Sequence, residues 1–163
     1  MLRIPFSLPV NHIQKITLGM VKLAGLSPKP IRLHSAQLVL NHVFSEAIED
    51  GDMDFLVGKV LVMQITDADF SLAITAIQKG DGLAIQCVDT LEGDANIRGD
   101  LSSFVQLSAK TVDADTLFFQ RKLVTEGDTA LGLEFKNLTD GFDLEQLPRS
   151  LQDGLNWLAT QHA

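Results

Sequence analysis

Three stretches in the middle of the chain follow the period of two that defines a β-strand. They span residues 59–66, 70–77 and 82–89. The first, KVLVMQIT, places apolar side chains on both faces, which predicts a strand covered on both sides. Asp, Gly and Lys turn residues separate the three stretches, so we expect the strands to form an antiparallel meander.

A strand, a Gly-Asp turn and a helix follow one another twice in the second half of the chain. NIRGDLSSFVQL places this turn at Gly99 and Asp100, and LVTEGDTALGLEF repeats it at Gly127 and Asp128. Glycine permits the sharp exit, and the aspartate accepts from free backbone N–H groups at the start of the helix, which is worth about 1 kcal/mol. We therefore expect both aspartates to be helix caps rather than catalytic groups.

A period of 3.6 predicts helices toward both ends of the chain. Residues 10–25 are expected to form an amphipathic helix, and LSPKPIRL (26–33), with two prolines in three residues, an extended linker. A second helix is expected over 36–50, with Ser35 as its N-cap and Gly51 as its stop. A last helix would open at Pro148.

The formal charge changes sign after the N-terminal segment 1–34, which we call the leader. Residues 1–34 carry five basic side chains and no acidic one, whereas the rest holds 8 basic and 21 acidic, so the formal charges are +5 and −13. The pattern divides the chain into a leader helix with its linker, 1–34, and a domain, 35–163. An acidic body is unsuited to nucleic acid, whose phosphates need clustered Lys and Arg.

A basic, apolar leader indicates contact with an anionic lipid surface or an acidic partner, and packing of the leader on the body is the alternative. The expected membrane-contact residues are Ile13, Ile16, Met20, Leu23, Lys15, Lys22 and Trp157. The single cysteine gives no disulfide framework, so a cytoplasmic protein, peripherally membrane-associated through its leader, is the expectation.

The sequence contains no motif typical of an enzyme site. The lone cysteine, Cys87, falls in the middle of a predicted strand, where an inert buried thiol is expected. The four histidines have no spacing that would converge on zinc, and no nucleophile elbow, P-loop or dinucleotide fingerprint is present. We therefore expect no catalytic residue, no metal and no cofactor.

Phenylalanines gather where the sheet is expected to meet the later helices. They are Phe104, Phe118, Phe119, Phe135 and Phe142. Sites for hydrophobic molecules are lined mostly by apolar and aromatic side chains. A filled core would use the same residues, and composition alone leaves both interpretations open.

The stretch ANIRGDLSSFVQLSAKTVDADTLFFQRKLVTEGDTALGLEFKNL, residues 95–138, resembles the sterol carrier protein type 2 lipid-binding domain. It has that family's strand, Gly-Asp turn and helix, then the segment DADTLFFQRKLVTEGD, then a small-residue helix ending in KNL. The resemblance covers about residues 35–143. It implies an α+β fold in which helices cover a five-stranded mixed sheet and enclose an apolar lipid tunnel, without catalysis by this chain.

Within that family, the leader and DTLFFQRKLVTEGDTALGLEFKNLTD (115–140) resemble accessory proteins of oxygen-independent (anaerobic) ubiquinone biosynthesis. This likeness implies a chain that binds a polyprenylated quinone precursor and presents it to partner enzymes, including paired iron–sulfur hydroxylase proteins. A general sterol-carrier-like protein for lipids or fatty-acyl groups is one alternative, and an enzyme acting on a small lipid is another.

The lipid cavity is expected along the 116–133 stretch. Phe118 and Phe119 would begin the strand that floors it, and Leu123 would point the same way as Phe119. The expected lipid-binding residues are Phe104, Leu107, Phe118, Phe119, Leu123, Leu131, Phe135, Leu138, Phe142, Leu151, Leu155 and Leu158.

Overall fold

The computed structural model describes residues 26, 28–141, 153, 156, 157 and 160 of the 163-residue chain. The leader helix expected over 10–25 and the opening of the last helix at Pro148 lie outside these residues. The described elements are α2 (Lys29–Val43), α3 (Ser45–Glu49), the 3-10 turn η1 (Asp54–Leu56), β1 (Leu61–Ile65), β2 (Phe70–Lys79), β3 (Gly82–Val88), β4 (Ala95–Gly99), α4 (Leu101–Ser108), α5 (Ala114–Phe119), β5 (Leu123–Gly127) and α6 (Thr129–Gly141).

The five strands form one mixed sheet in the order β3-β2-β1-β4-β5. Neighbouring strands are antiparallel except β1 and β4, which run parallel. The expected meander is therefore confirmed in β1, β2 and β3, and so is the α+β class with a five-stranded mixed sheet.

The connection from β3 to β4 has to cross β2 and β1, which lie between them. A Cβ atom at Gly93 would lie 2.7 Å from Cγ2 of Val62, so the crossing segment runs directly against that side chain. Val62 points away from its buried neighbour Leu61 because side chains alternate along a strand. The segment thus helps to bury Val62, which is fully buried on the sheet face that carries none of the described helices.

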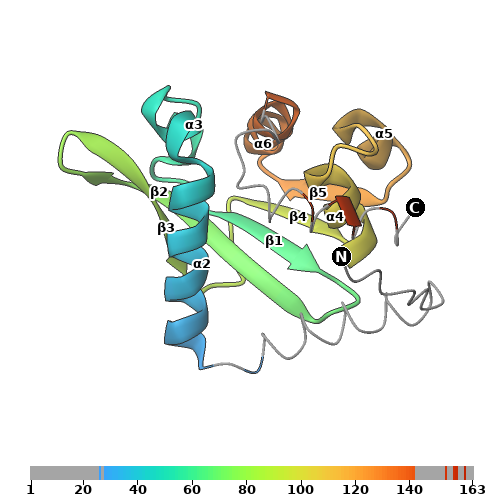
Figure 1. Ribbon diagram of the computed structural model, residues 1–163, viewed down its shortest axis with the longest axis horizontal. Helices are drawn as coiled ribbons and strands as arrows, with labels where there is room; N and C mark the ends of the chain where they lie inside the picture. Colours follow the sequence, from blue (N-terminus) through green and yellow to red (C-terminus); the bar gives the residue numbers. More distant parts are fainter. Residues whose placement is uncertain (1–25, 27, 142–152, 154–155, 158–159, 161–163) are drawn as a thin grey trace, which may run out of the picture.

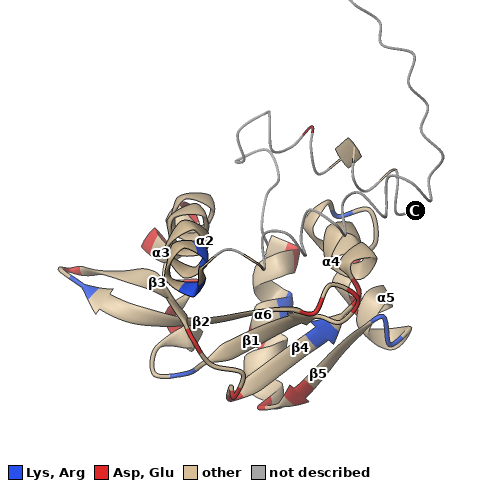
Figure 2. Cartoon of the chain, turned by 90° about the horizontal axis from the view of Figure 1, so that it is seen from below, with Lys and Arg blue, Asp and Glu red and all other residues tan. Residues whose placement is uncertain are grey.

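The helices cover the other face of the sheet in two groups, which Figure 1 shows over opposite edges. In the first group, α2 and α3 pack on β3. In the second, α6 packs on β4 and β5 and contacts α5. Figure 2 shows the same separation from below, with α2 and α3 at one end of the sheet and α4 and α5 at the other. The core lies between helices and strands, and includes Leu61, Ile74, Ile97, Leu117 and Leu131.

The linker expected over 26–33 is wrong, because α2 begins at Lys29. Pro28 is the N-cap with extended backbone, and Pro30 lies in the first turn. A proline there costs little, since the first N–H groups of a helix have no intrahelical partner. Ser35 consequently lies inside α2 rather than at its cap, and the expected division after residue 34 falls within the helix.

Two amide side chains of α2 attach the helix to the edge strand β3. Asn41 donates from Nδ2 to the carbonyl of Ile85 (2.7 Å) and accepts from the Ile85 N–H through Oδ1 (2.9 Å). Gln37 accepts from the Cys87 N–H through Oε1 at 3.2 Å. An edge strand has one row of backbone groups without a neighbouring strand, and these two side chains supply partners for part of it.

We predict that Asn41→Leu will destabilise the fold by about 1–3 kcal/mol, because it leaves a half-buried N–H and C=O of Ile85 without partners while keeping the side-chain size. Urea denaturation measures the loss, and amide hydrogen exchange should accelerate at Ile85. His42→Leu, at the adjacent exposed position of α2, is the control. Equal stability of the two variants would contradict the attachment.

Candidate functional site

An apolar cavity of about 350 Å³ lies over the middle of the sheet, on the face that carries the helices. Its floor is formed by Leu61 and Met63 of β1 and Ile74 of β2. The walls come from α2, from residues 53–56, from α4 with the turn after it, and from α6. They are Val39, Leu40, Val43, Phe44, Met53, Phe55, Leu56, Phe104, Leu107, Ser108, Lys110, Phe135, Leu138 and Thr139.

The cavity exists because both helix groups are held close to the outer strands. Asn41 and Gln37 fix α2 to β3. On the other side Gly132 lets α6 approach the sheet, since a Cβ there would lie 2.4 Å from Cγ2 of Thr125 on β5. The central strand β1 lies between these two anchor points, and its side chains Leu61 and Met63 therefore border a cavity instead of a helix.

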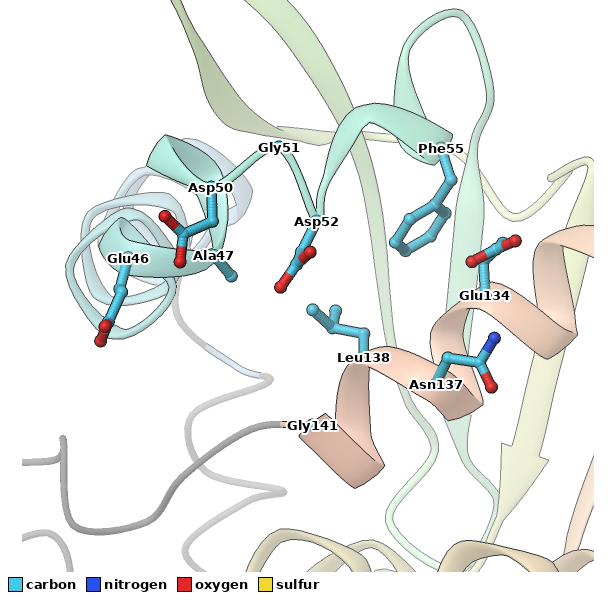
Figure 3. A pocket seen from close by; sticks show the side chains of 10 residues that line it. All are labelled: Glu46, Ala47, Asp50, Gly51, Asp52, Phe55, Glu134, Asn137, Leu138 and Gly141. Carbon is cyan, nitrogen blue, oxygen red and sulfur yellow. The ribbon is translucent and has the colours of Figure 1, made fainter.

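A second cavity of about 490 Å³ adjoins the first and shares Phe55 and Leu138 with it. It is lined by α3 and the turn after it on one side and by α6 on the other (Figure 3). Figure 3 shows Leu138 and Phe55 between the Asp52 carboxylate and the α6 side chains Asn137 and Glu134. The complete lining is Glu46, Ala47, Asp50, Gly51, Asp52, Phe55, Glu134, Asn137, Leu138 and Gly141.

Gly51 sets the shape of this second cavity by ending α3, as the sequence predicts. Its φ of 85° is the left-handed conformation that glycine adopts without strain. The reversal is closed by a hydrogen bond from the Asp52 N–H to the Ala47 carbonyl at 2.9 Å. Asp50 and Asp52 thereby flank the turn on the side that faces α6 (Figure 3).

The predicted lipid-binding residues separate into distinct groups. Phe104, Leu107, Phe135 and Leu138 line the apolar cavity. Leu123 and Leu131 are buried in the packed core and do not line it. Phe118 borders a shallow depression of about 160 Å³ between α5, β5 and α6. Phe142, Leu151, Leu155 and Leu158 lie outside the described residues.

The expectation that Phe118 and Phe119 begin a strand is wrong, because both end the helix α5. Asp113 caps this helix by accepting from the Thr116 N–H (2.8 Å) and hydroxyl (2.7 Å), and these bonds hold the pKa of the Asp113 carboxyl below its ordinary value. Phe119 is 91% exposed, whereas Leu123, which starts β5, is buried, so the two do not point the same way.

The Gly-Asp turns are confirmed as helix caps. Asp100 accepts from the Ser103 N–H at 2.7 Å, and Asp128 accepts from the N–H groups of Ala130 (3.0 Å) and Leu131 (3.2 Å). The Leu131 bond and an ion pair with Lys59 lower the pKa of Asp128. Both carboxylates are thus occupied by structural partners.

Sequence reasoning missed the half of the cavity that comes from α2, β1 and β2. The apolar stripe of the 36–50 segment was visible in Leu40, Val43 and Phe44, and the floor in Met63. These patterns show that a side chain is buried, but they do not show whether it meets another side chain or a cavity. Only the distance between the two helix groups, which arises from tertiary packing, decides that.

Cys87 is buried on β3 and is 8% exposed. Burial away from water raises the pKa of its thiol to about 11, so the reactive thiolate is scarce at neutral pH. Over the residues that the structure describes, no group of three His, Cys, Asp or Glu side chains is placed to hold a metal ion.

Comparison with known proteins places this geometry in context. Residues 38–140 match the family model of the SCP-2 sterol transfer family. The ubiquinone biosynthesis accessory factor UbiT of Escherichia coli strain K12 is 37% identical over 134 residues, which are 82% of this chain and 75% of that protein. The solved structure of the UbiJ-SCP2 ubiquinone synthesis protein has the same fold, with a TM-score of 0.53 at 18% identity over 71% of this chain and 98% of that one.

None of the described helices has both the length and the apolar character that crossing a membrane requires.

We predict that Cys87 will react slowly with iodoacetamide in the folded protein. At pH 8 a thiol of pKa about 11 has a thiolate fraction about two orders of magnitude below that of an unfolded cysteine of pKa about 8.5. The folded pKa is the higher one, so this group favours folding below about pH 8.5 and loses that contribution as the pH rises toward 11. Equal labelling rates with and without urea would contradict this burial.

Proposed function

The chain belongs to the SCP-2 sterol transfer family, and from that membership we propose that it is a non-catalytic, lipid-binding accessory protein of ubiquinone biosynthesis. Its ligand would be a polyprenylated quinone precursor. It would present this lipid to partner enzymes of the oxygen-independent pathway, among them iron–sulfur hydroxylase proteins. The observation that carries the proposal is an apolar cavity in a chain 37% identical to a ubiquinone biosynthesis accessory factor.

The chemistry of the cavity suits a hydrocarbon tail. Its floor and most of its walls are alkyl and aromatic side chains. Moving a CH₂ group from water into such surroundings is worth about 0.8 kcal/mol, so a few isoprene units bind firmly without directional hydrogen bonds. Phe104, Leu107, Phe135 and Leu138 are the predicted lipid-binding residues that border this space.

The lining supports carriage rather than catalysis. No carboxylate, imidazole or thiol is among the described side chains of the apolar cavity. Its one basic group, Lys110, donates from Nζ to the Asp140 carbonyl at 2.9 Å. An acid–base mechanism needs a positioned proton donor or acceptor at the reacting atom, and this lining supplies no such pair. A general carrier of fatty-acyl lipids is the second candidate, because a hydrocarbon site alone does not select an isoprenoid.

Membrane contact belongs to the same proposal. A protein that collects a prenylated lipid has to reach the membrane in which that lipid dissolves. The proposed contacts are Ile13, Ile16, Met20, Leu23, Lys15, Lys22 and Trp157. Of these the structure describes Trp157, which is 52% exposed and therefore accessible to an interface.

We predict that Met63→Trp will lower the amount of co-purifying lipid at least tenfold, because the larger ring fills the cavity from its floor. Lipid extraction followed by mass spectrometry measures the loss, and the identified tail distinguishes prenyl from fatty-acyl ligands. Leu133→Trp, on the exposed face of α6, is the control and should keep its lipid. If the wild-type protein yields no prenylated or acylated lipid under mild purification, the proposed function fails.

We predict that removing residues 1–25, which end before α2 begins, will weaken binding to anionic vesicles at least tenfold in low salt. The segment carries Arg3, Lys15 and Lys22, and a basic residue near an anionic surface is worth about 1 kcal/mol. Vesicle flotation measures the loss, and melting curves establish that the remaining domain is folded. Unchanged flotation would show that the leader is not the anchor.

A further inference from the structure

Four carboxylates, Glu46, Asp50, Asp52 and Glu134, line the second cavity, which we call the acidic vestibule. We propose that the acidic vestibule makes the protein select lipids whose polar end is neutral or cationic and reject those ending in phosphate or carboxylate. The inference rests on the proposed function, because it assumes a hydrocarbon tail in the apolar cavity. The carboxylates are not a binding site by themselves; they set the electrostatic potential where the lipid emerges.

The geometry places the polar end of such a lipid in the vestibule. Phe55 and Leu138 line both cavities, so the two spaces meet at these side chains. On the tail side of Leu138 the wall is apolar, with Phe135 and Phe44. On the other side Asp52, Glu134 and the amide of Asn137 surround the opening (Figure 3). An amphiphile placed across Phe55 and Leu138 would have its tail against an apolar lining and its polar end against a negatively charged one.

Among the residues that the structure describes, no basic side chain compensates the charge of the vestibule. No Lys or Arg is part of its described lining. The ion pairs that the structure shows use other carboxylates, those of Asp89, Asp94, Asp115, Asp128 and Glu126. Like charges around one opening repel an anion, and salt screens this repulsion over a Debye length of about 8 Å at physiological ionic strength.

Lys110 is the competing site for an anionic end. It lines the apolar cavity from the end of α4, but its amine already donates to the last turn of α6 at the Asp140 carbonyl. One lysine that already has a hydrogen-bond partner is therefore opposed by four carboxylates that form no ion pair with a described residue. The balance favours a phenolic or hydroxyl head over a carboxylated or phosphorylated one, which in a prenylated ring means a ring without a carboxylate.

Three probes with the same tail test this selection on the full-length chain. They are farnesol, farnesyl phosphate and farnesylamine, which differ in the charge of one end. We expect farnesol to bind at least tenfold more tightly than farnesyl phosphate, and farnesylamine at least as tightly as farnesol. Raising the ionic strength from about 0.01 M to about 1 M should shrink these differences, because the Debye length falls from about 30 to about 3 Å.

The vestibule variant carries Glu46→Gln, Asp50→Asn, Asp52→Asn and Glu134→Gln, which remove the charge and keep the shape. It should bind farnesol unchanged and bring farnesyl phosphate to within about threefold of it. The control variant removes the same charge elsewhere, by Asp69→Asn, Asp81→Asn, Glu92→Gln and Glu126→Gln, and should keep the tenfold preference. Circular dichroism checks that both variants fold.

Equal binding of farnesol and farnesyl phosphate to the wild-type chain would overturn the inference while leaving the lipid-binding function intact. So would a preference for the phosphate that disappears in Lys110→Gln, since that locates the polar end at α4. An unchanged preference in the vestibule variant would equally reject it. If none of the three probes binds, the proposed function fails, and the charge selection falls with it.

Discussion

The structure depends on two groups of helices that cover one apolar face of the sheet and are each attached near one of its outer strands, β3 or β5. Asn41 and Gln37 fasten α2 to β3, and the close approach at Gly132 seats α6 on β5. Each helix group then shields the strands nearest to it. The two helix groups form the walls on either side of β1, but no described side chain fills the space directly above it. The cavity over Leu61 and Met63 follows from these two attachments.

The two adjoining cavities combine an apolar lining with a polar one. The apolar one suits a tail, and the vestibule that shares Phe55 and Leu138 with it suits a polar end. A carrier has to hold its cargo firmly enough to extract it and loosely enough to deliver it. In the proposed function, burial of the hydrocarbon tail would hold the lipid without directional hydrogen bonds, and the vestibule would leave the polar end of the lipid accessible to a partner.

Local sequence signals predicted the elements well wherever short-range chemistry decides the outcome. The caps at Asp100 and Asp128 and the stop at Gly51 are of this kind, because each satisfies backbone groups within a few residues. The same kind of signal was misjudged at the Pro28–Pro30 segment, which opens a helix, and at Phe118 and Phe119, which end one. A proline pair or an aromatic pair is compatible with more than one backbone conformation. The Asp113 cap favours the helix that contains Phe118 and Phe119, whereas α2 begins at Pro28 without a side-chain cap.

The cavity itself was predicted only in part. Phe104, Leu107, Phe135 and Leu138 were expected, whereas Leu40, Phe44 and Met63 were not. Periodicity identifies the buried side of each helix or strand, but the width of the space between two elements depends on contacts far apart in sequence. Asn41 bonded to Ile85, which is 44 positions away, is such a contact. Its partner cannot be deduced from the residues around it.

The attachment of α2 to β3 also occupies part of the outer edge of the sheet. Outer strands are where sheets of separate molecules join and grow into aggregates. The outward-facing backbone groups of Ile85 and Cys87 are already hydrogen-bonded to the side-chain amides of Asn41 and Gln37 on α2. A strand of another molecule therefore finds the ladder interrupted at Ile85 and Cys87, and this part of the sheet edge is protected against strand addition.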